Sequence, residues 1–395
     1  MPPKKTPEPV KRIQWGRPSN NLKMGLVGLP NVGKSTTFNV LTKCAVPASN
    51  FPFCTIDPHE AIVEVPDARF DWLAENFKPG SQVRAKLTVW DIAGLVPNAH
   101  KGEGLGNAFL SNIQGVDGIY HVCRAFRDED VIHTEGEVDP VRDLQTITSE
   151  LIMKDLSFVD SWTGDISRKL KANPKNKELK DELDALEKAK ALLDAGTPIR
   201  CSDDWSNKEV EILNKHHFLT TKPVVYLVNM SPEDFARQKN KYLAGIKTWV
   251  DAHGGGPIIP YSAAFETKVV ELETKDAKEK YMAEIGAKKS MLDKIIQTGY
   301  EFLELIHFFT VGETEVRCWT VRGGAKAPEA AGTIHSDFER GFICADVYKY
   351  QDIRELGNEA EVKAKGKIQQ VGKTYEVLDG DICHFKFNVS NPSKK

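Results

Sequence analysis

The sequence lacks the patterns that mark membrane, secreted and metal-cluster proteins. Over its 395 residues no apolar run reaches the roughly 18 residues that a membrane span needs. The first 21 residues carry charge and proline but no apolar core, so we expect no signal peptide. The seven cysteines are scattered without any CxxC spacing, which argues against a zinc cluster or a disulfide framework. We therefore expect a cytoplasmic protein with reduced thiols; the few N-terminal lysines leave additional nuclear residence open.

The sequence also has no excess of basic residues. Its 53 lysines and arginines and 56 aspartates and glutamates give a net charge of −3, which excludes a chain that is basic overall. Lysine-rich stretches at 239–241 and 363–367 are either solvated surface or local contacts for RNA phosphates. We expect no membrane partner, no sequence-specific contact with DNA, and a monomer.

What the sequence does contain is a series of short apolar runs separated by helical patterns, as in an α/β protein. Its length exceeds the roughly 250 to 300 residues over which one core grows, so we expect two or three packed units. One predicted strand precedes a glycine-rich segment at 28–35. The other predicted strands lie at 61–65, 86–94, 118–126, 223–230 and 257–263. Several of these runs are apolar throughout, which favours strands covered by helices on both faces.

Two further segments have a different composition. Residues 143–195 carry apolar side chains at helical spacing among many charges, and Pro174 with two asparagines interrupts them within 171–178. This pattern predicts two antiparallel helices, which are either a plain surface pair or a recognition arm. Residues from about 303 to 389 combine short strand-like runs with Gly and Asp-Gly turns, which predicts a separate small α+β domain.

The clearest functional signal is the segment GLPNVGKS at 28–35. It satisfies the GxxxxGK[ST] pattern, and it lies between a predicted strand and a predicted helix, as that motif requires. The backbone N–H groups of such a loop surround phosphate oxygens, Lys34 would neutralise charge on the β- and γ-phosphates, and the Ser35 hydroxyl would complete a Mg²⁺ site. The sequence therefore predicts a site for a nucleoside triphosphate.

Two downstream segments fit the same site. WDIAGL at 90–95 ends an apolar run with Asp91, in the place of a Mg²⁺-associated acid, followed by Gly94, whose amide would sense the γ-phosphate. Between the two motifs lies Thr55, where a switch-loop threonine would close over Mg²⁺ and the γ-phosphate. Together these residues predict a nucleotide-dependent switch rather than a metabolic kinase.

The segment that should read the base departs from the GTPase pattern. GTPases of this kind use NKxD, whose Asp accepts hydrogen bonds from guanine N1–H and the exocyclic amine. Here the segment reads VNMSPED: Asn229 is kept, Met230 replaces Lys, and Pro232 replaces the Asp. Guanine discrimination should therefore be lost. Adenine needs backbone contacts and an apolar slot, which Met230 could supply beside the SAA loop with Ser262 and Ala263.

The group that positions water in a Ras-like GTPase is also missing. Leu95 stands after DxxG where such enzymes carry glutamine, and an apolar side chain cannot orient water. The nearby candidates are His133 and His100, although a lone loop histidine is more often a solvated residue. Glycines 102, 104 and 106 are either hinges of a switch segment or plain loop residues. A non-enzymatic module that binds nucleotide without turnover is the alternative.

Taken together, these motifs resemble the Obg-like ATPase (YchF) family. The matching segments run in order along nearly the whole chain: GLPNVGKST, NFPFCTIDP, DIAGLV, GEGLGNAFL, YLVNM, AAGTIHSDFERGFICAD and DGDICHFKFN. The resemblance implies an α/β P-loop NTPase fold. The expected units are a flexible tail over 1–21, an Obg-type nucleotide-binding domain over 22–282 interrupted by a helical coiled-coil arm at about 143–200, a ubiquitin-like β-grasp (TGS) domain over 303–386, and a flexible tail over 387–395.

The resemblance further implies ATP hydrolysis in preference to GTP, dependence on Mg²⁺, and association with ribosomes in translational or stress control. Ser35 and Thr55 would ligate Mg²⁺, Met230 would meet adenine through its backbone, and His133 would act with Lys34 in catalysis. Asn31 also matches relatives that hold K⁺ beside the phosphates. The residues that would bind the phosphates are Asn31, Val32, Gly33, Lys34, Ser35 and Thr36.

One position departs from the family pattern. Members usually carry Glu third after the asparagine of the base loop, whereas here Pro232 stands there and Glu233 follows. Proline stiffens the loop because its ring fixes φ at about −65°. If the family's Glu contributes to base choice, base selectivity in this chain rests on other groups, and a conventional GTPase translation factor is the competing hypothesis.

Overall fold

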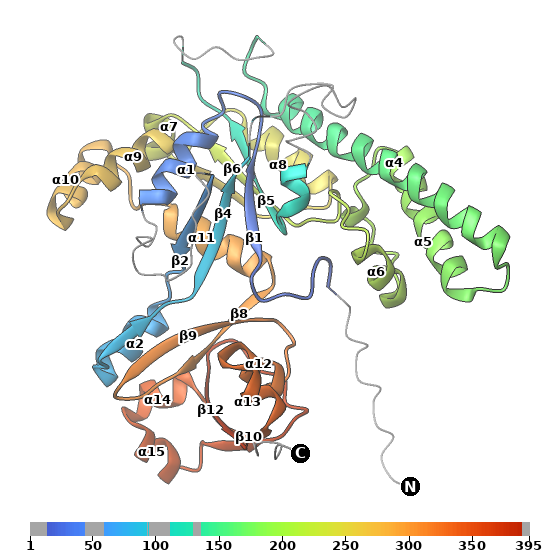
Figure 1. The fold of residues 1–395 in the computed structure, drawn as a ribbon. Helices are drawn as coiled ribbons and strands as arrows, with labels where there is room; N and C mark the ends of the chain where they lie inside the picture. Colours follow the sequence, from blue (N-terminus) through green and yellow to red (C-terminus); the bar gives the residue numbers. More distant parts are fainter. Residues whose placement is uncertain (1–13, 44–58, 93, 95–110, 129–135, 389–395) are drawn as a thin grey trace, which may run out of the picture.

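In a computed structural model, the chain is described over residues 14–43, 59–92, 94, 111–128 and 136–388. Two six-stranded sheets organise it, and they lie one above the other in Figure 1. A long helical hairpin projects from the side of the upper sheet (Figure 1). Within these ranges, every helix is too short or too polar to cross a membrane.

The upper, central sheet has the strand order β2-β4-β1-β5-β6-β7. Its strands are parallel except β2, which runs antiparallel to β4. The middle strands β5 and β6 are buried along their whole length, as strands between two layers of helices should be. The bounds are β1 Lys23–Val27, β2 Glu60–Glu64, β4 Lys86–Asp91, β5 Gly118–Arg124, β6 Val224–Asn229 and β7 Ile258–Tyr261.

All six predicted strands are confirmed, and several of them end earlier than expected. The strand predicted over 86–94 ends at Asp91, and the strand predicted over 118–126 ends at Arg124. The apolar pattern runs past both ends because Ile92 and Ala125 are as deeply buried as the strands themselves. The carboxyl ends of the parallel strands meet at one edge, so the loops that follow them form a common surface there.

Helices pack against both faces of the central sheet (Figure 1). α1 (Lys34–Lys43) starts directly after the glycine-rich turn and packs against α9 (Ala263–Glu271). α11 (Leu292–Phe302) lies against β5 and β6 and then leads into the lower sheet. The remaining helices of this unit are η3 Ile199–Cys201, α6 Asn207–Asn214, α7 Pro232–Arg237, α8 Leu243–Ala252 and α10 Lys275–Ile285.

The hairpin consists of α4 (Pro140–Ala172) and α5 (Lys177–Asp194), which confirms the predicted pair of helices. α4 begins at Pro140 because proline suits the first helical position and the Asp139 carboxylate accepts the N–H groups of the next turn. The helices share an apolar seam that includes Ile166 and Leu186. The hairpin therefore has a core of its own and does not depend on the central sheet for all of its packing.

The lower, C-terminal sheet is mixed, with the order β11-β10-β12-β8-β9-β3. Its edge strand β3 (Ser81–Val83) comes from the N-terminal part of the chain and pairs in parallel with β9. The strand was not predicted, because three half-exposed or exposed residues have no apolar periodicity. The other elements are β8 Leu305–Thr310, β9 Glu315–Arg322, β10 Phe342–Lys349, β11 Gln369–Val371, β12 Asp381–Phe387, α12 Ala327–Ile334, α13 Ser336–Arg340, α14 Tyr350–Leu356 and α15 Glu359–Ala364.

Two more segments connect the sheets. α2 (Ala68–Phe77), which follows β2, packs against β9. Residues 14–21 fall within the segment that was expected to be a tail, and the structure shows them in contact with both sheets. There the Arg17 guanidinium donates to the Asp117 carboxylate at 2.7 Å, and Arg322 of β9 donates to the Trp15 carbonyl at 2.5 Å.

Candidate nucleotide-binding site

The glycine-rich segment 28–35 forms the turn between β1 and α1, and two of its glycines have no room for a side chain. A Cβ at Gly28 would lie 2.7 Å from the Val122 carbonyl oxygen, and one at Gly33 would lie 2.3 Å from Asn229 Nδ2. Gly33 also has a φ of 97°, which L-residues rarely adopt. At these two glycines the backbone lies close to β5 and β6. The first turn of α1 follows, and its N–H groups have no carbonyl partner within the helix.

Lys34 is buried in this turn, with 7% of its surface exposed. Its Nζ donates to the Leu29 carbonyl at 2.6 Å, and Gly94 lies so close that a Cβ there would be 3.1 Å from Nζ. Burial lowers the pKa of Lys34 to about 8, against the opposing effect of the Asp91 carboxylate. The structure thus brings together the three predicted residues Lys34, Asp91 and Gly94.

Ser35 and Asp91 lie side by side at the mouth of the turn. The Ser35 hydroxyl forms a hydrogen bond with the Asp91 carboxylate. Burial raises the pKa of Asp91, and Lys34, Ser35 and His59 partly oppose this shift. A hydroxyl and a carboxylate are hard oxygen ligands, so this pair fits the preferences of Mg²⁺.

A pocket of 540 Å³ opens beside the turn, between the loops that follow β5, β6 and β7. Met230, which was predicted to face adenine, is 2% exposed, and its N–H donates to the Tyr261 carbonyl at 2.8 Å. Ser262 is fully buried and caps α9, where its hydroxyl accepts the Phe265 N–H. The residues that line the pocket are Asn31, Gly33, Lys34, Ser35, Thr36, Phe126, Arg127, Asp128, Asn229, Met230, Ser231, Pro232, Glu233, Ala263 and Ala264.

The Asn229 side chain ties two walls of this pocket together. Its Nδ2 donates to the Val32 carbonyl at 3.0 Å, and its Oδ1 accepts the Ala263 N–H at 2.9 Å. Both ends of the amide are therefore used, and the side chain is only 4% exposed. Asn229 therefore holds the glycine-rich turn against the loop after β7.

Arg124, at the end of β5, is a member of this site that sequence reasoning missed. Its side chain is 1% exposed, and the guanidinium donates to the carbonyls of Phe126 at 3.3 Å and Asn31 at 3.4 Å. It therefore contacts both the glycine-rich turn and the segment 126–128 that lines the pocket. The signal was present in the sequence, since an arginine stands inside an otherwise apolar strand pattern.

Seven of the residues considered from the sequence lie outside the described residues: Thr55, Leu95, His100, Gly102, Gly104, Gly106 and His133. The other predicted site residues surround one place in the fold, formed by the turn after β1, the end of β4 and the loops after β6 and β7. These residues are Asn31, Val32, Gly33, Lys34, Ser35, Thr36, Asp91, Gly94, Asn229, Met230, Ser262 and Ala263.

Two protein-family models match the chain. Residues 23–159 match the family described as 50S ribosome-binding GTPase. Residues 305–388 match YchF-GTPase_C, which is described as a protein of unknown function. The first match covers the glycine-rich turn and the DxxG segment, and the second covers most of the C-terminal sheet.

Whole-length relatives extend these matches. The chain is 56% identical to Obg-like ATPase 1 of rice and 52% identical to Obg-like ATPase 1 of human, in both cases over 100% of each protein. It is also similar to the solved structure of the fission yeast YchF GTPase, with a TM-score of 0.86, 50% identity, and coverage of 95% of this chain and 100% of that chain. These similarities and the P-loop geometry lead to one conclusion: the chain is a P-loop nucleotide hydrolase that belongs to the Obg-like ATPase (YchF) family.

Proposed function

We propose that this protein hydrolyses ATP in preference to GTP and uses the nucleotide as a switch. The observation that carries the proposal is the base loop after β6. Ser231 caps α7, with its hydroxyl accepting the Asp234 N–H at 3.2 Å, and Pro232 is the first helical residue. The position from which a GTPase presents its guanine-reading Asp is thus a proline, whose side chain has no group to accept a hydrogen bond from guanine.

Adenine would be recognised through the main chain of the same loop. Because the Met230 N–H donates to Tyr261, its carbonyl is the group that would accept a hydrogen bond from the adenine amine. Ala263 and Ala264 supply apolar wall on the opposite side. Glu233 also lines the pocket, so Glu233→Gln should alter the ratio of ATP to GTP affinity if its carboxylate takes part in base choice.

Mg²⁺ would be held by Ser35, with Asp91 beside it and Thr55 completing the set. When bound, the ion supplies charge neutralisation on the β- and γ-phosphates. The expected effect of Ser35→Ala is a large loss of hydrolysis that excess Mg²⁺ only partly restores. Asn31 is the proposed contact for a monovalent ion, and a faster rate in KCl than in NaCl at equal ionic strength would support it.

For catalysis we propose that Lys34 neutralises phosphate charge and that His133 orients the attacking water. Lys34 is buried beside Gly94, where a γ-phosphate-sensing amide is expected, and this supports the first role. The second role rests on the family resemblance. His133→Ala should lower kcat and leave ATP affinity nearly unchanged, whereas a histidine that only shapes the fold would change both.

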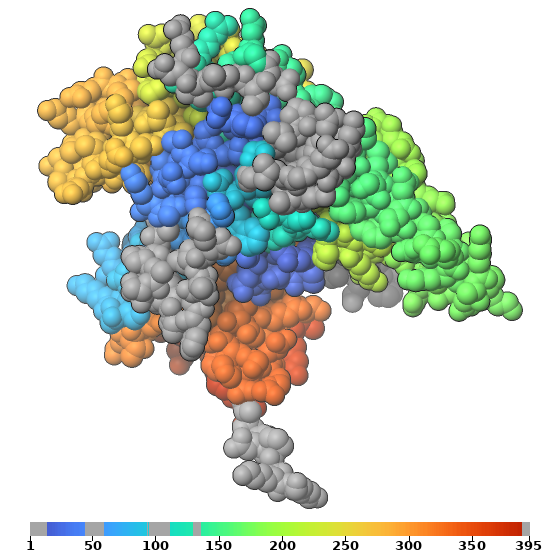
Figure 2. All heavy atoms as spheres, turned by 45° about the horizontal axis from the view of Figure 1, so that its top comes forward, coloured from blue at the N-terminus to red at the C-terminus, as the bar shows by residue number. Residues whose placement is uncertain are grey.

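We also propose that ATP binding controls association with ribosomes in the cytoplasm. In support, the turn of the hairpin carries the exposed lysines Lys171, Lys175 and Lys177, which suit RNA phosphates. Lys171→Glu with Lys177→Glu should reduce co-sedimentation with ribosomes. The matched control is Lys275→Glu with Lys280→Glu on α10, which lies on the opposite side of the molecule (Figure 2). Equal association with ATP, ADP and no nucleotide would contradict the switch.

Single-turnover hydrolysis of ATP and of GTP, each with Mg²⁺ and with EDTA, tests the enzymatic part of the proposal. We expect Mg²⁺-dependent release of phosphate from ATP that is faster than release from GTP. Faster turnover of GTP would assign the chain to the GTPase translation factors. Retention of intact ATP without phosphate release would show a binding module instead.

A further inference from the structure

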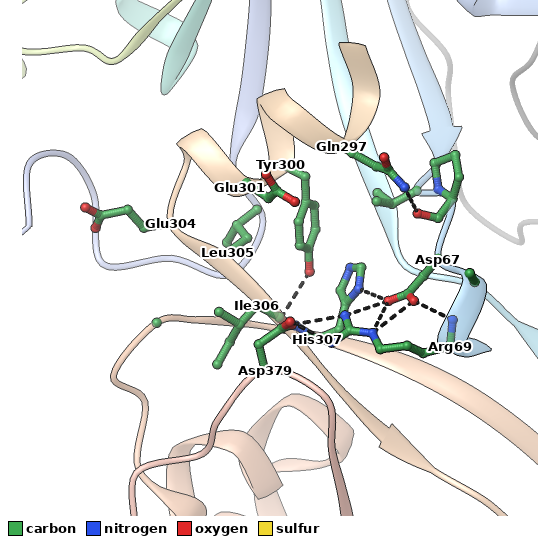
Figure 3. A pocket seen from close by; sticks show the side chains of 14 residues that line it. Asp67, Arg69, Gln297, Tyr300, Glu301, Glu304, Leu305, Ile306, His307 and Asp379 are labelled. Carbon is green, nitrogen blue, oxygen red and sulfur yellow. Dashed lines mark hydrogen bonds and ion pairs between the residues drawn. The ribbon is translucent and has the colours of Figure 1, made fainter. Parts of the chain in front are cut away.

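A second pocket, of 490 Å³, lies at the junction of the two sheets, away from the nucleotide site (Figure 3). Its walls come from the segment between β2 and α2, from the carboxyl end of α11, from β8, and from the turn before β12. Nothing in the proposed nucleotide cycle uses this pocket. It joins residues that are far apart in the sequence, such as Asp67 and His307, which are separated by 240 positions.

A network of charged groups forms the floor of the pocket. Arg69 forms ion pairs with Asp67 at 2.7 Å and with Asp379 at 2.6 Å. His307 Nδ1 lies 2.9 Å from the Asp67 carboxylate, and the His307 backbone N–H donates to Asp379 at 2.9 Å. Since an ionised carboxylate can only accept, Nδ1 carries the hydrogen of the imidazole. The second ring nitrogen, Nε2, is then a hydrogen-bond acceptor in the neutral ring.

That second nitrogen has no hydrogen-bond partner among the residues that the structure describes. The His307 side chain is only 6% exposed, and Figure 3 shows its ring pointing from β8 into the space between Tyr300 and Gln297. Buried polar atoms in proteins are nearly always satisfied. The half-buried Gln297, whose amide donates to the Pro66 carbonyl, lines the same pocket.

The charge around the pocket favours a cation. Four carboxylates line it, and two of them, those of Asp67 and Asp379, are paired with the guanidinium of Arg69. The other two belong to Glu301 and to Glu304, on which the Arg322 guanidinium acts electrostatically. The carboxyl end of the 11-residue α11 adds partial negative charge at the same place. Glu304 also has a φ of 57°, at a position after the helix where glycine is usual. A glutamate in this conformation strains the backbone, and such strain is typical of residues whose side chain binds a ligand.

The walls indicate an organic cation. Val65, Pro66, Leu305 and Ile306 offer apolar surface to methylene groups. Within the described ranges, no three His, Cys, Asp or Glu side chains are arranged to hold a metal ion. A ligand must therefore combine N–H donors for Nε2 and the carboxylates with an aliphatic stem. We propose that this pocket binds a linear aliphatic polyamine, which would bridge the two sheets and hold the C-terminal sheet in its docked position.

Binding of spermidine to the nucleotide-free full-length protein tests the proposal by calorimetry at low salt. Nucleotide is left out because polyamines also bind its phosphates. We expect saturable 1:1 binding that Glu301→Gln and Glu304→Gln each weaken about fivefold. The matched control is Glu187→Gln on the exposed face of α5, which makes the same change in net charge and should leave binding unaltered.

Nitrogen-15 NMR of the histidine side chains provides a readout at the site itself. The His307 Nε2 resonance should move on addition of spermidine, as its lone pair accepts a hydrogen bond, and MgCl₂ at equal ionic strength should not move it. Absence of saturable binding would overturn the proposal. So would equal weakening by Glu187→Gln, an unmoved His307 resonance, or the same response to Mg²⁺.

Discussion

The two ends of the central sheet each bury a charged side chain. Burial determines the pKa of the first, and hydrogen bonds determine the pKa of the second. At the carboxyl edge, Lys34 has the Leu29 carbonyl as a hydrogen-bond partner, and burial lowers its pKa to about 8. At the opposite edge, burial works to raise the pKa of Asp67, but hydrogen bonds from His307 and Arg69 outweigh it and hold the pKa well below its usual range. The Lys34 charge is thus only partly compensated by the protein, whereas the Asp67 charge is compensated by His307 and Arg69.

The two sites differ in whether the protein itself satisfies the buried charge. A buried charge that the protein itself satisfies stabilises the fold, whereas a buried charge that remains disfavoured is available to a ligand of opposite sign. Substitutions at the two ends should therefore separate activity from stability. The four predictions that follow use this contrast, and the first two should show opposite patterns.

The largest effect is expected for Lys34→Met. Removing the ammonium should lower kcat/KM for hydrolysis about 10³-fold, or ~4 kcal/mol, because developing phosphate charge loses its buried counter-charge. The free energy of unfolding should not fall, since the folded state no longer buries a disfavoured charge. Steady-state kinetics and urea unfolding measure the two effects. Lys43→Met, at the exposed end of the same helix, is the control and should retain activity.

Asp67→Asn should give the reverse pattern. The substitution leaves Arg69 and His307 without their shared carboxylate, which should lower the free energy of unfolding by about 3 kcal/mol. Hydrolysis per folded molecule should be kept. Because the folded-state pKa of Asp67 is depressed, its contribution is present above the unfolded pKa and is lost as the pH falls below about 4. Asp71→Asn, an exposed acid of α2 paired with Arg84, should cost less than about 1 kcal/mol.

Asp155 extends the comparison to a third buried charge, at the junction of the hairpin with the central sheet. It accepts the N–H groups of Leu219 and Thr220 at 2.9 and 2.8 Å, but burial prevails and raises its pKa to about 6. Between about pH 4 and pH 6 the folded state holds a proton that the unfolded state has lost, so stability should decrease as the pH rises through this window, by about 2 kcal/mol.

The matching measurement is urea unfolding of the wild type and of Asp155→Asn across that pH range. The difference in free energy of unfolding between the two proteins should change over the window, because the wild type becomes less stable as the pH rises. The slope is opposite in sign to the one expected for Asp67. A difference that does not vary with pH would show that Asp155 is ionised in the folded protein throughout.

The smallest effect is expected at the junction pocket. Glu304→Gly should raise the free energy of unfolding by about 0.5 to 1 kcal/mol, because glycine adopts its positive φ without strain. Glu301→Gly is the control: it lies in the last turn of α11, where glycine should cost about 1 kcal/mol. Urea midpoints distinguish the two variants. A lower midpoint for Glu304→Gly than for the wild type would show that Glu304 is not strained at its positive φ.

The parts of this molecule that the sequence predicts well are those whose signals are local. The glycine-rich turn, the five downstream strands and the two hairpin helices each lie within a short stretch whose periodicity or motif is sufficient. The segments around Asp91 and Asn229 were assigned to one site from their motifs, and in the fold they meet because parallel strands bring their carboxyl ends together. Asn229 reaches the Val32 carbonyl across 197 positions as a consequence of that rule.

What sequence reasoning missed depends on contacts that have no local signature. β3 is three residues long and is a strand only because β9 pairs with it. The contact between Asp67 and His307 requires the docking of one sheet on another, which periodicity cannot show. Arg124 was visible as a charge in an apolar run, but its role under the turn depends on where β5 ends. Such features follow from tertiary packing, not from propensity.

Equilibrium binding of ATP and of GTP to the purified chain with Mg²⁺ decides whether this P-loop hydrolase selects ATP. We expect a lower dissociation constant for ATP, because the Pro232 side chain offers no acceptor to guanine and the Met230 carbonyl can accept a hydrogen bond from the adenine amine. A lower dissociation constant for GTP would contradict it, and the loop after β6 would then read guanine by another route.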